Sequence, residues 1–90
     1  MIRHTVYFSG QVQGVGFRYT TQRIARRYTV SGYVQNLPDG RVLLIVEGEP
    51  QQVKTFVDHV ARTMRDYIHE QIVEARPATG EFAEGFHVRL

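Results

Sequence analysis

The run Val42-Leu43-Leu44-Ile45-Val46 is the feature that most constrains how this chain folds. A strand made of these residues is apolar on both faces, which is typical of a strand in the interior of a sheet. The segment Arg41 to Gly48 is therefore predicted to be an interior strand with other strands beside it. The turn sequence Leu37-Pro38-Asp39-Gly40 comes directly before it and predicts a hairpin to the preceding strand.

The rest of the chain alternates between strand and helix patterns. These patterns predict strands over Arg3 to Gly10, Val30 to Gln35, Tyr67 to Ala75 and Phe86 to Leu90, helices over Tyr19 to Thr29 and from Pro50 through Met64, and a loop over Pro77 to Gly85. The order β-α-β-β-α-β, followed by a short C-terminal strand, predicts an α+β ferredoxin-like sandwich. In this fold two helices cover one face of an antiparallel sheet. The fold hosts many functions and does not by itself indicate one.

Composition narrows the class of protein. A chain of 90 residues is expected to form a single domain over residues 1–90. The absence of cysteine excludes disulfides, thiolate chemistry and sulfur-based zinc sites, and it fits a reducing cytoplasm, where we expect the protein. No apolar segment has the length of a signal sequence or a membrane span, so no membrane partner is expected. The net charge of +2 is too small to indicate nucleic-acid binding.

A glycine-rich stretch, Gly10 to Arg18, joins the first strand to the first helix. Glycines at positions 10, 14 and 16 let the backbone turn its N–H groups toward one point. Arg18 stands where the helix begins, and a cation there opposes the helix dipole unless an anion binds beside it. The pattern predicts a site for a small oxyanion such as a phosphoryl group, although a flexible turn and a solvated arginine would give the same sequence. It is neither a Walker motif nor a dinucleotide-binding fingerprint.

Asn36 is a second candidate, at the end of a predicted strand just before the hairpin turn. Asparagine is common near turns, but its amide both donates and accepts, which suits the positioning of a water molecule. We expect the first and third strands to be neighbours and the second strand to lie beyond the third. Asn36 then lies near the glycine loop only if the two strand ends share an edge of the sheet.

Other polar groups indicate no chemistry. The four histidines are scattered without the spacing of metal ligands, and the glycine loop contains no pair of carboxylates. Glu47 and Glu49 flank Gly48 and are expected to be solvated. The arginines of the first helix leave a nucleic-acid-binding module open as an alternative, but the interior strand lacks the aromatic residues of a base-stacking platform.

The segment G-Q-V-Q-G-V-G-F-R over Gly10 to Arg18, followed by Gly32-Tyr33-Val34-Gln35-Asn36, resembles the acylphosphatase family. The resemblance continues through the second helix to Phe86-His87-Val88-Arg89. It implies hydrolysis of the carboxyl–phosphate bond of a small-molecule acyl phosphate to a carboxylate and inorganic phosphate, with no metal or other cofactor. It also implies roles by position, in which Asn36 holds the attacking water and the phosphoryl oxygens are bound by Arg18 and the loop amides of Gly14, Val15, Gly16 and Phe17.

The chain departs from the family pattern at two places. Tyr33 stands where the family usually has Trp, and Thr63-Met64-Arg65-Asp66 replaces the usual Gly-Pro after the second helix. These departures bear on packing and substrate access rather than on the reaction. A non-catalytic domain that holds phosphate, either alone or within a larger maturation protein that uses carbamoyl phosphate, stays open as an alternative. We expect a complete, monomeric protein, and the sequence does not identify the physiological acyl phosphate.

Overall fold

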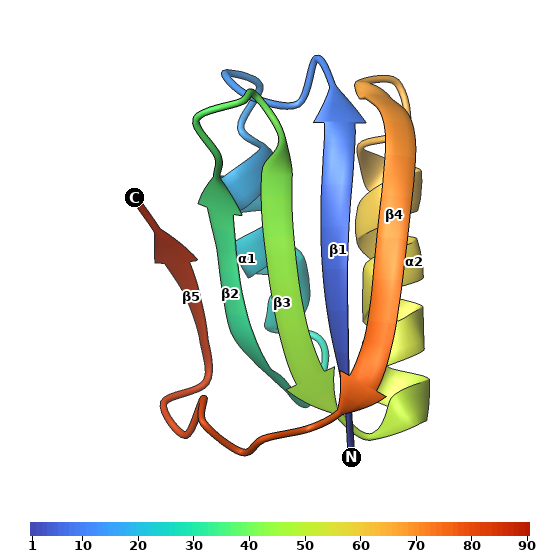
Figure 1. Cartoon of the computed structure of the whole chain (residues 1–90), viewed down its shortest axis with the longest axis vertical. Coiled ribbons are helices and arrows are strands. Elements are labelled where there is room, and N and C mark those ends of the chain that lie inside the picture. The colour runs from blue at the N-terminus through green and yellow to red at the C-terminus, as the bar shows by residue number, and fades with distance from the viewer.

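The computed structural model describes all residues, 1–90. Its elements follow in the order β1 (Ile2–Gly10), α1 (Phe17–Ala25), β2 (Val30–Asn36), β3 (Val42–Gly48), α2 (Pro50–Thr63), β4 (Ile68–Pro77) and β5 (Phe86–Arg89). All strands belong to one sheet, and both helices lie behind the same face of it (Figure 1). This arrangement confirms the predicted ferredoxin-like α+β fold. Neither helix combines the length and the apolar character that crossing a bilayer requires.

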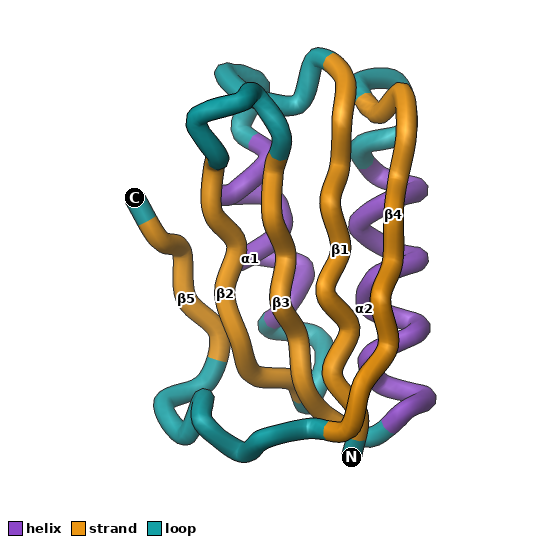
Figure 2. The backbone as a smooth tube through the Cα atoms, in the orientation of Figure 1, coloured by secondary structure: helices purple, strands orange, loops and turns teal.

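The strand order in the sheet is β4-β1-β3-β2-β5. The apolar strand β3 is therefore central, as its sequence predicts, and it pairs antiparallel with both β1 and β2. The short strand β5 instead pairs parallel to β2, so the sheet is mixed rather than wholly antiparallel. The cause is the segment 78–85, which crosses along the end of the sheet where β4 finishes and β2 starts (Figure 2). A strand that begins after this crossing runs in the direction of β2.

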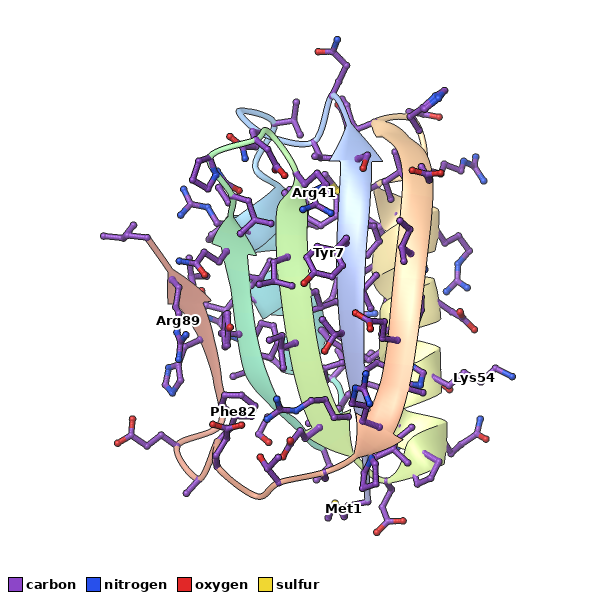
Figure 3. The ribbon with its side chains drawn as sticks, in the orientation of Figure 1. Met1, Tyr7, Arg41, Lys54, Phe82 and Arg89 are labelled. Atoms are coloured by element: carbon purple, nitrogen blue, oxygen red, sulfur yellow. The ribbon has the colours of Figure 1, made fainter.

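The core lies between the sheet and the two helices. Alternate residues of β1, β2 and β3 point toward the helices and are buried, namely Val6, Phe8, Val34, Val42, Leu44 and Val46. The buried stripe of α2 consists of Val53, Phe56, Val57 and Val60. No element covers the opposite face of the sheet, where the Arg41 guanidinium lies 4.5 Å from the ring centroid of Tyr7 (Figure 3). The apolar interior is thus confined to the helix-covered face.

The helix predicted over Tyr19 to Thr29 differs from α1 at both ends. It begins earlier because Gly16, in a left-handed conformation, turns the chain directly into the helix. It ends earlier because the N–H groups of Arg27 and Tyr28 donate to the carbonyls three residues back, those of Ile24 and Ala25, which closes the last turn; the N–H of Thr29 then donates to the side-chain oxygen of Gln52 on α2 at 2.9 Å. Arg18 therefore occupies the first turn of α1, as the sequence predicts.

The expectation that Glu47 is solvated is wrong, because its side chain is only 4% exposed. In the register of β1 and β3 it lies opposite Arg3, whose Nε donates to the carboxylate at 2.8 Å. The N–H groups of Thr79 and Gly80 donate to the same carboxylate at 2.9 and 3.0 Å. Glu47 therefore fastens the start of the crossing segment 78–85 to the centre of the sheet. The pattern of charges around Gly48 gave no sign of these distant partners.

Acid is expected to destabilise the fold through Glu47. Burial alone would raise the pKa of this carboxyl, but hydrogen bonds from Thr79, Arg3 and Gly80 outweigh burial and hold the pKa below its ordinary value. A carboxyl whose pKa is lowered by folding stabilises the native state above its unfolded pKa of about 4.5, and the stabilisation disappears as the pH falls through the folded pKa. We expect Glu47→Gln to lower the free energy of unfolding at pH 7 by about 1–3 kcal/mol.

Urea unfolding of wild type and Glu47→Gln between pH 7 and pH 3 measures this effect. The variant is expected to lose less stability than wild type over the acid range, because it has no carboxyl to protonate at this position. Glu49→Gln is the matched control, since Glu49 is exposed and forms no salt bridge. Equal acid sensitivity of wild type and Glu47→Gln would contradict the prediction.

Candidate active site

The glycine loop after β1 carries a set of free backbone donors. Gly14 and Gly16 have φ values of 79° and 78°, in the left-handed region that residues with side chains rarely adopt. The N–H groups of Gly14, Val15 and Gly16 donate to no backbone carbonyl. The first N–H groups of α1, which follows directly, also lack partners within the helix. This part of the chain can therefore donate several hydrogen bonds to an anion.

The loop is held firmly at both of its ends. Val12 is fully buried, and the ring of Phe17 packs on Phe8 with the two centroids 5.0 Å apart. Gly10 was expected to help shape the anion site, but it does not line the site cavity, which Gly14 and Gly16 do line. A Cβ at this position would lie 2.5 Å from the carbonyl oxygen of Tyr67, so Gly10 permits the close approach of the segment that enters β4.

Arg18 brings a positive charge to the end of the loop. Its Nη1 donates to the carbonyl of Arg89 on β5 at 2.9 Å, which orients the guanidinium and leaves its other donors available. No acidic residue lies in the first turn of α1, and no carboxylate forms a salt bridge with Arg18. The charge therefore adds to the positive end of the helix dipole without compensation. A bound anion would supply that compensation.

Asn36 reaches the same end of the sheet as the loop. Because β1 and β2 are both antiparallel to β3, they run in the same direction and finish at one edge of the sheet (Figure 1). Val42 pairs with Phe8 on one side and with Asn36 on the other, so Asn36 faces the helices as Phe8 does. Its side-chain oxygen is buried and has no hydrogen-bond partner. The two strands thus finish at the same end of the sheet, which is the condition under which Asn36 lies near the glycine loop.

Gln13 connects the two halves of the site, a contact that the sequence did not predict. Its side-chain Nε2 donates to the carbonyl of Leu37 at 2.8 Å and to that of Arg41 at 2.9 Å. These two residues close the neck of the β2–β3 hairpin, where the N–H of Leu37 donates to the Arg41 carbonyl. Gln13 precedes Gly14, and Leu37 follows Asn36. The bridge therefore fixes the end of β2 relative to the glycine loop.

One cavity of about 370 Å³ brings most of the predicted residues together. Five of them line it, namely Gly14, Gly16, Phe17, Arg18 and Asn36. Val15 does not, and its side chain instead packs against the hydrophobic core. Five further residues line it that were not predicted, namely Val12, Tyr19, Gln22, Val88 and Leu90. Tyr19 could have been found from its place beside Arg18, whereas Val88 and Leu90 lie far away in the chain and reach the site only through the parallel pairing of β5.

Comparisons with known proteins agree with this geometry. A family model described as acylphosphatase matches residues 4–88. An acylphosphatase from Rubrobacter xylanophilus is 47% identical over 88 residues, which is 97% of this chain and 79% of that protein. An acylphosphatase from Thermus thermophilus is 36% identical over 88 residues, which is 98% of this chain and 99% of that protein.

Solved structures give the same result. The crystal structure of acylphosphatase from Bacillus subtilis has a TM-score of 0.88 and 27% identity, and the match covers 100% of both chains. The crystal structure of T. kodakarensis HypF matches with a TM-score of 0.82 and 27% identity, and it covers 100% of this chain but 12% of that one. The matches to this chain thus include short proteins and a small part of a much larger one. From the family model and these relatives, the chain belongs to the acylphosphatase family.

Proposed function

We propose that the cavity between the glycine loop and Asn36 is the site at which this acylphosphatase hydrolyses its substrate. Arg18 and the N–H groups of residues 14–17 bind the phosphoryl oxygens, and Asn36 orients the attacking water. The observation that carries this proposal is that Arg18, the free N–H groups of the glycine loop and Asn36 meet at one cavity, in which Arg18 is the only charged side chain. The cavity thus combines donors for an anion with an amide that can orient a water molecule.

The reaction needs little acid–base help from the protein. The water oxygen attacks phosphorus while the bond from phosphorus to the carboxyl oxygen breaks, and the electron pair of that bond leaves with the carboxylate. A carboxylic acid has a pKa of about 4, so the leaving group departs without being protonated. The water passes a proton to an oxygen of the phosphoryl group, since no Asp or Glu side chain lines the cavity. Arg18 and the backbone donors stabilise the charge spread over the phosphoryl oxygens, so the step requires no metal ion.

The Asn36 amide suits a reacting water as well as an anion. Its NH2 group can donate to a phosphoryl oxygen, and its oxygen can accept from a water molecule that also bonds to the phosphoryl group. A domain that only held phosphate would need the donors alone, so turnover is the property that separates the two functions.

Hydrolysis of benzoyl phosphate in the presence of excess chelator tests the proposal. We expect release of benzoate and phosphate at the same rate with and without the chelator. The monoester 4-nitrophenyl phosphate serves as a control and is expected to be hydrolysed far more slowly, because its leaving group is more basic. Activity that the chelator abolishes would contradict the metal-free mechanism. Phosphate binding without turnover of benzoyl phosphate would instead support the non-catalytic alternative.

A further inference from the structure

The site cavity extends beyond the groups that would hold phosphate. Its lining includes Tyr19 and Gln22 on α1 and Val88 on β5, so it continues into the space between these two elements. Tyr19 directly follows Arg18 in the chain, yet its side chain plays no part in the proposed hydrolysis. The residue is 65% exposed, which is unusual for an aromatic residue beside a catalytic group. The cavity therefore has a charged part at Arg18 and an apolar part at Tyr19 and Val88.

A second hollow adjoins the site cavity and shares one lining residue with it. Gln22 lines both the site cavity and a neighbouring cavity of about 180 Å³, whose lining includes Val30 and Phe86. The Arg23 guanidinium lies 5.8 Å from the ring centroid of Tyr19, within the range of a cation–π contact. The ring thus has a defined neighbour on α1 while most of its surface remains open to a ligand.

We propose that this apolar part is an acyl subsite, in which Tyr19 and Val88 contact the acyl group of the substrate. The inference rests on the proposed function, because it assumes that the phosphoryl group sits at Arg18. With the phosphoryl group there, the acyl group must leave the charged part of the cavity, and the lining offers it Tyr19 and Val88. Covering the exposed ring removes apolar surface of both partners from water. The chain therefore prefers acyl phosphates with an aromatic or other apolar acyl group over acetyl phosphate.

The ratio of kcat/KM for benzoyl phosphate to that for acetyl phosphate measures the preference. Tyr19→Ala is expected to lower this ratio about fivefold, the effect of losing one aromatic contact. Tyr19→Phe keeps the ring and is expected to keep the ratio of wild type. Val88→Thr preserves the shape of the second wall but makes it polar, and it is expected to lower the ratio in the same direction.

Binding of two non-hydrolysable probes tests the subsite without turnover. Calorimetry is expected to show that wild type binds phenylphosphonate more tightly than methylphosphonate and that Tyr19→Ala loses most of the difference. A difference that persists in Tyr19→Ala and in Val88→Thr, or equal binding of the two probes to wild type, would overturn the acyl subsite. Failure of the proposed function gives a different pattern, in which wild type hydrolyses neither acyl phosphate whatever the two phosphonates do.

Discussion

Replacing Arg18 with alanine is expected to lower kcat/KM for benzoyl phosphate by roughly 10³-fold and to weaken competitive inhibition by inorganic phosphate. Arg18 has the only charged side chain that lines the cavity, so no other side chain can take over the attraction of the phosphoryl group. Its charge acts on the bound substrate and on the transition state alike, and both KM and kcat are therefore expected to change. Steady-state kinetics with phosphate as inhibitor measure both effects.

Two further variants separate the charge of Arg18 from its shape. Arg18→Lys keeps the charge but loses the planar fork that bonds two oxygens at once, and it is expected to retain only part of the activity. Arg27→Ala removes the same charge from the same stretch of sequence, outside the site cavity, and is expected to act like wild type. Undiminished phosphate inhibition in Arg18→Ala would show that the anion binds elsewhere.

The fold could be predicted to a large extent because its signals are local. The apolar run of β3, the proline at the start of α2 and the turn before β3 each act within a few residues, and together they give the order of elements. The direction of β5 and the burial of Glu47 could not be predicted in this way. Both depend on the crossing segment 78–85, whose bonds to Arg3 and Glu47 join residues distant in the chain. The periodic pattern of apolar residues in the sequence carries no information about such contacts.

The residues of the site likewise divide into those that a local motif reveals and those that only the fold brings together. The glycine loop and Arg18 form one short stretch, so the sequence brings them together directly. The position of Asn36 follows from topology, and the sequence could state only the condition for it. Gln13 and Val88 were missed for different reasons: Gln13 acts through a side-chain contact to backbone carbonyls of the hairpin, and Val88 arrives through a strand pairing. Val15 contributes to the site only through its backbone N–H, because its side chain packs against the core.

Replacing Asn36 with alanine is expected to reduce kcat for benzoyl phosphate by roughly 10²- to 10³-fold while leaving inhibition by inorganic phosphate nearly unchanged. The contrast with Arg18→Ala follows from the separate positions of the two groups, one on the phosphoryl oxygens and one on the water. Asn36→Asp is a sharper variant, because it keeps an acceptor but places a negative charge beside the phosphoryl group. It is expected to weaken phosphate inhibition as well as to lower kcat.

The stability of Asn36→Ala distinguishes a role in the reaction from a role in the fold. The side-chain oxygen of Asn36 makes no hydrogen bond to another group of the protein, so its removal breaks no bond within the fold. Removing it should therefore leave the free energy of unfolding unchanged or raise it, in spite of the loss of activity. Urea unfolding of wild type and variant measures this difference. A variant that lost stability together with activity would place Asn36 among the residues that support the hairpin, and full turnover would remove it from the mechanism.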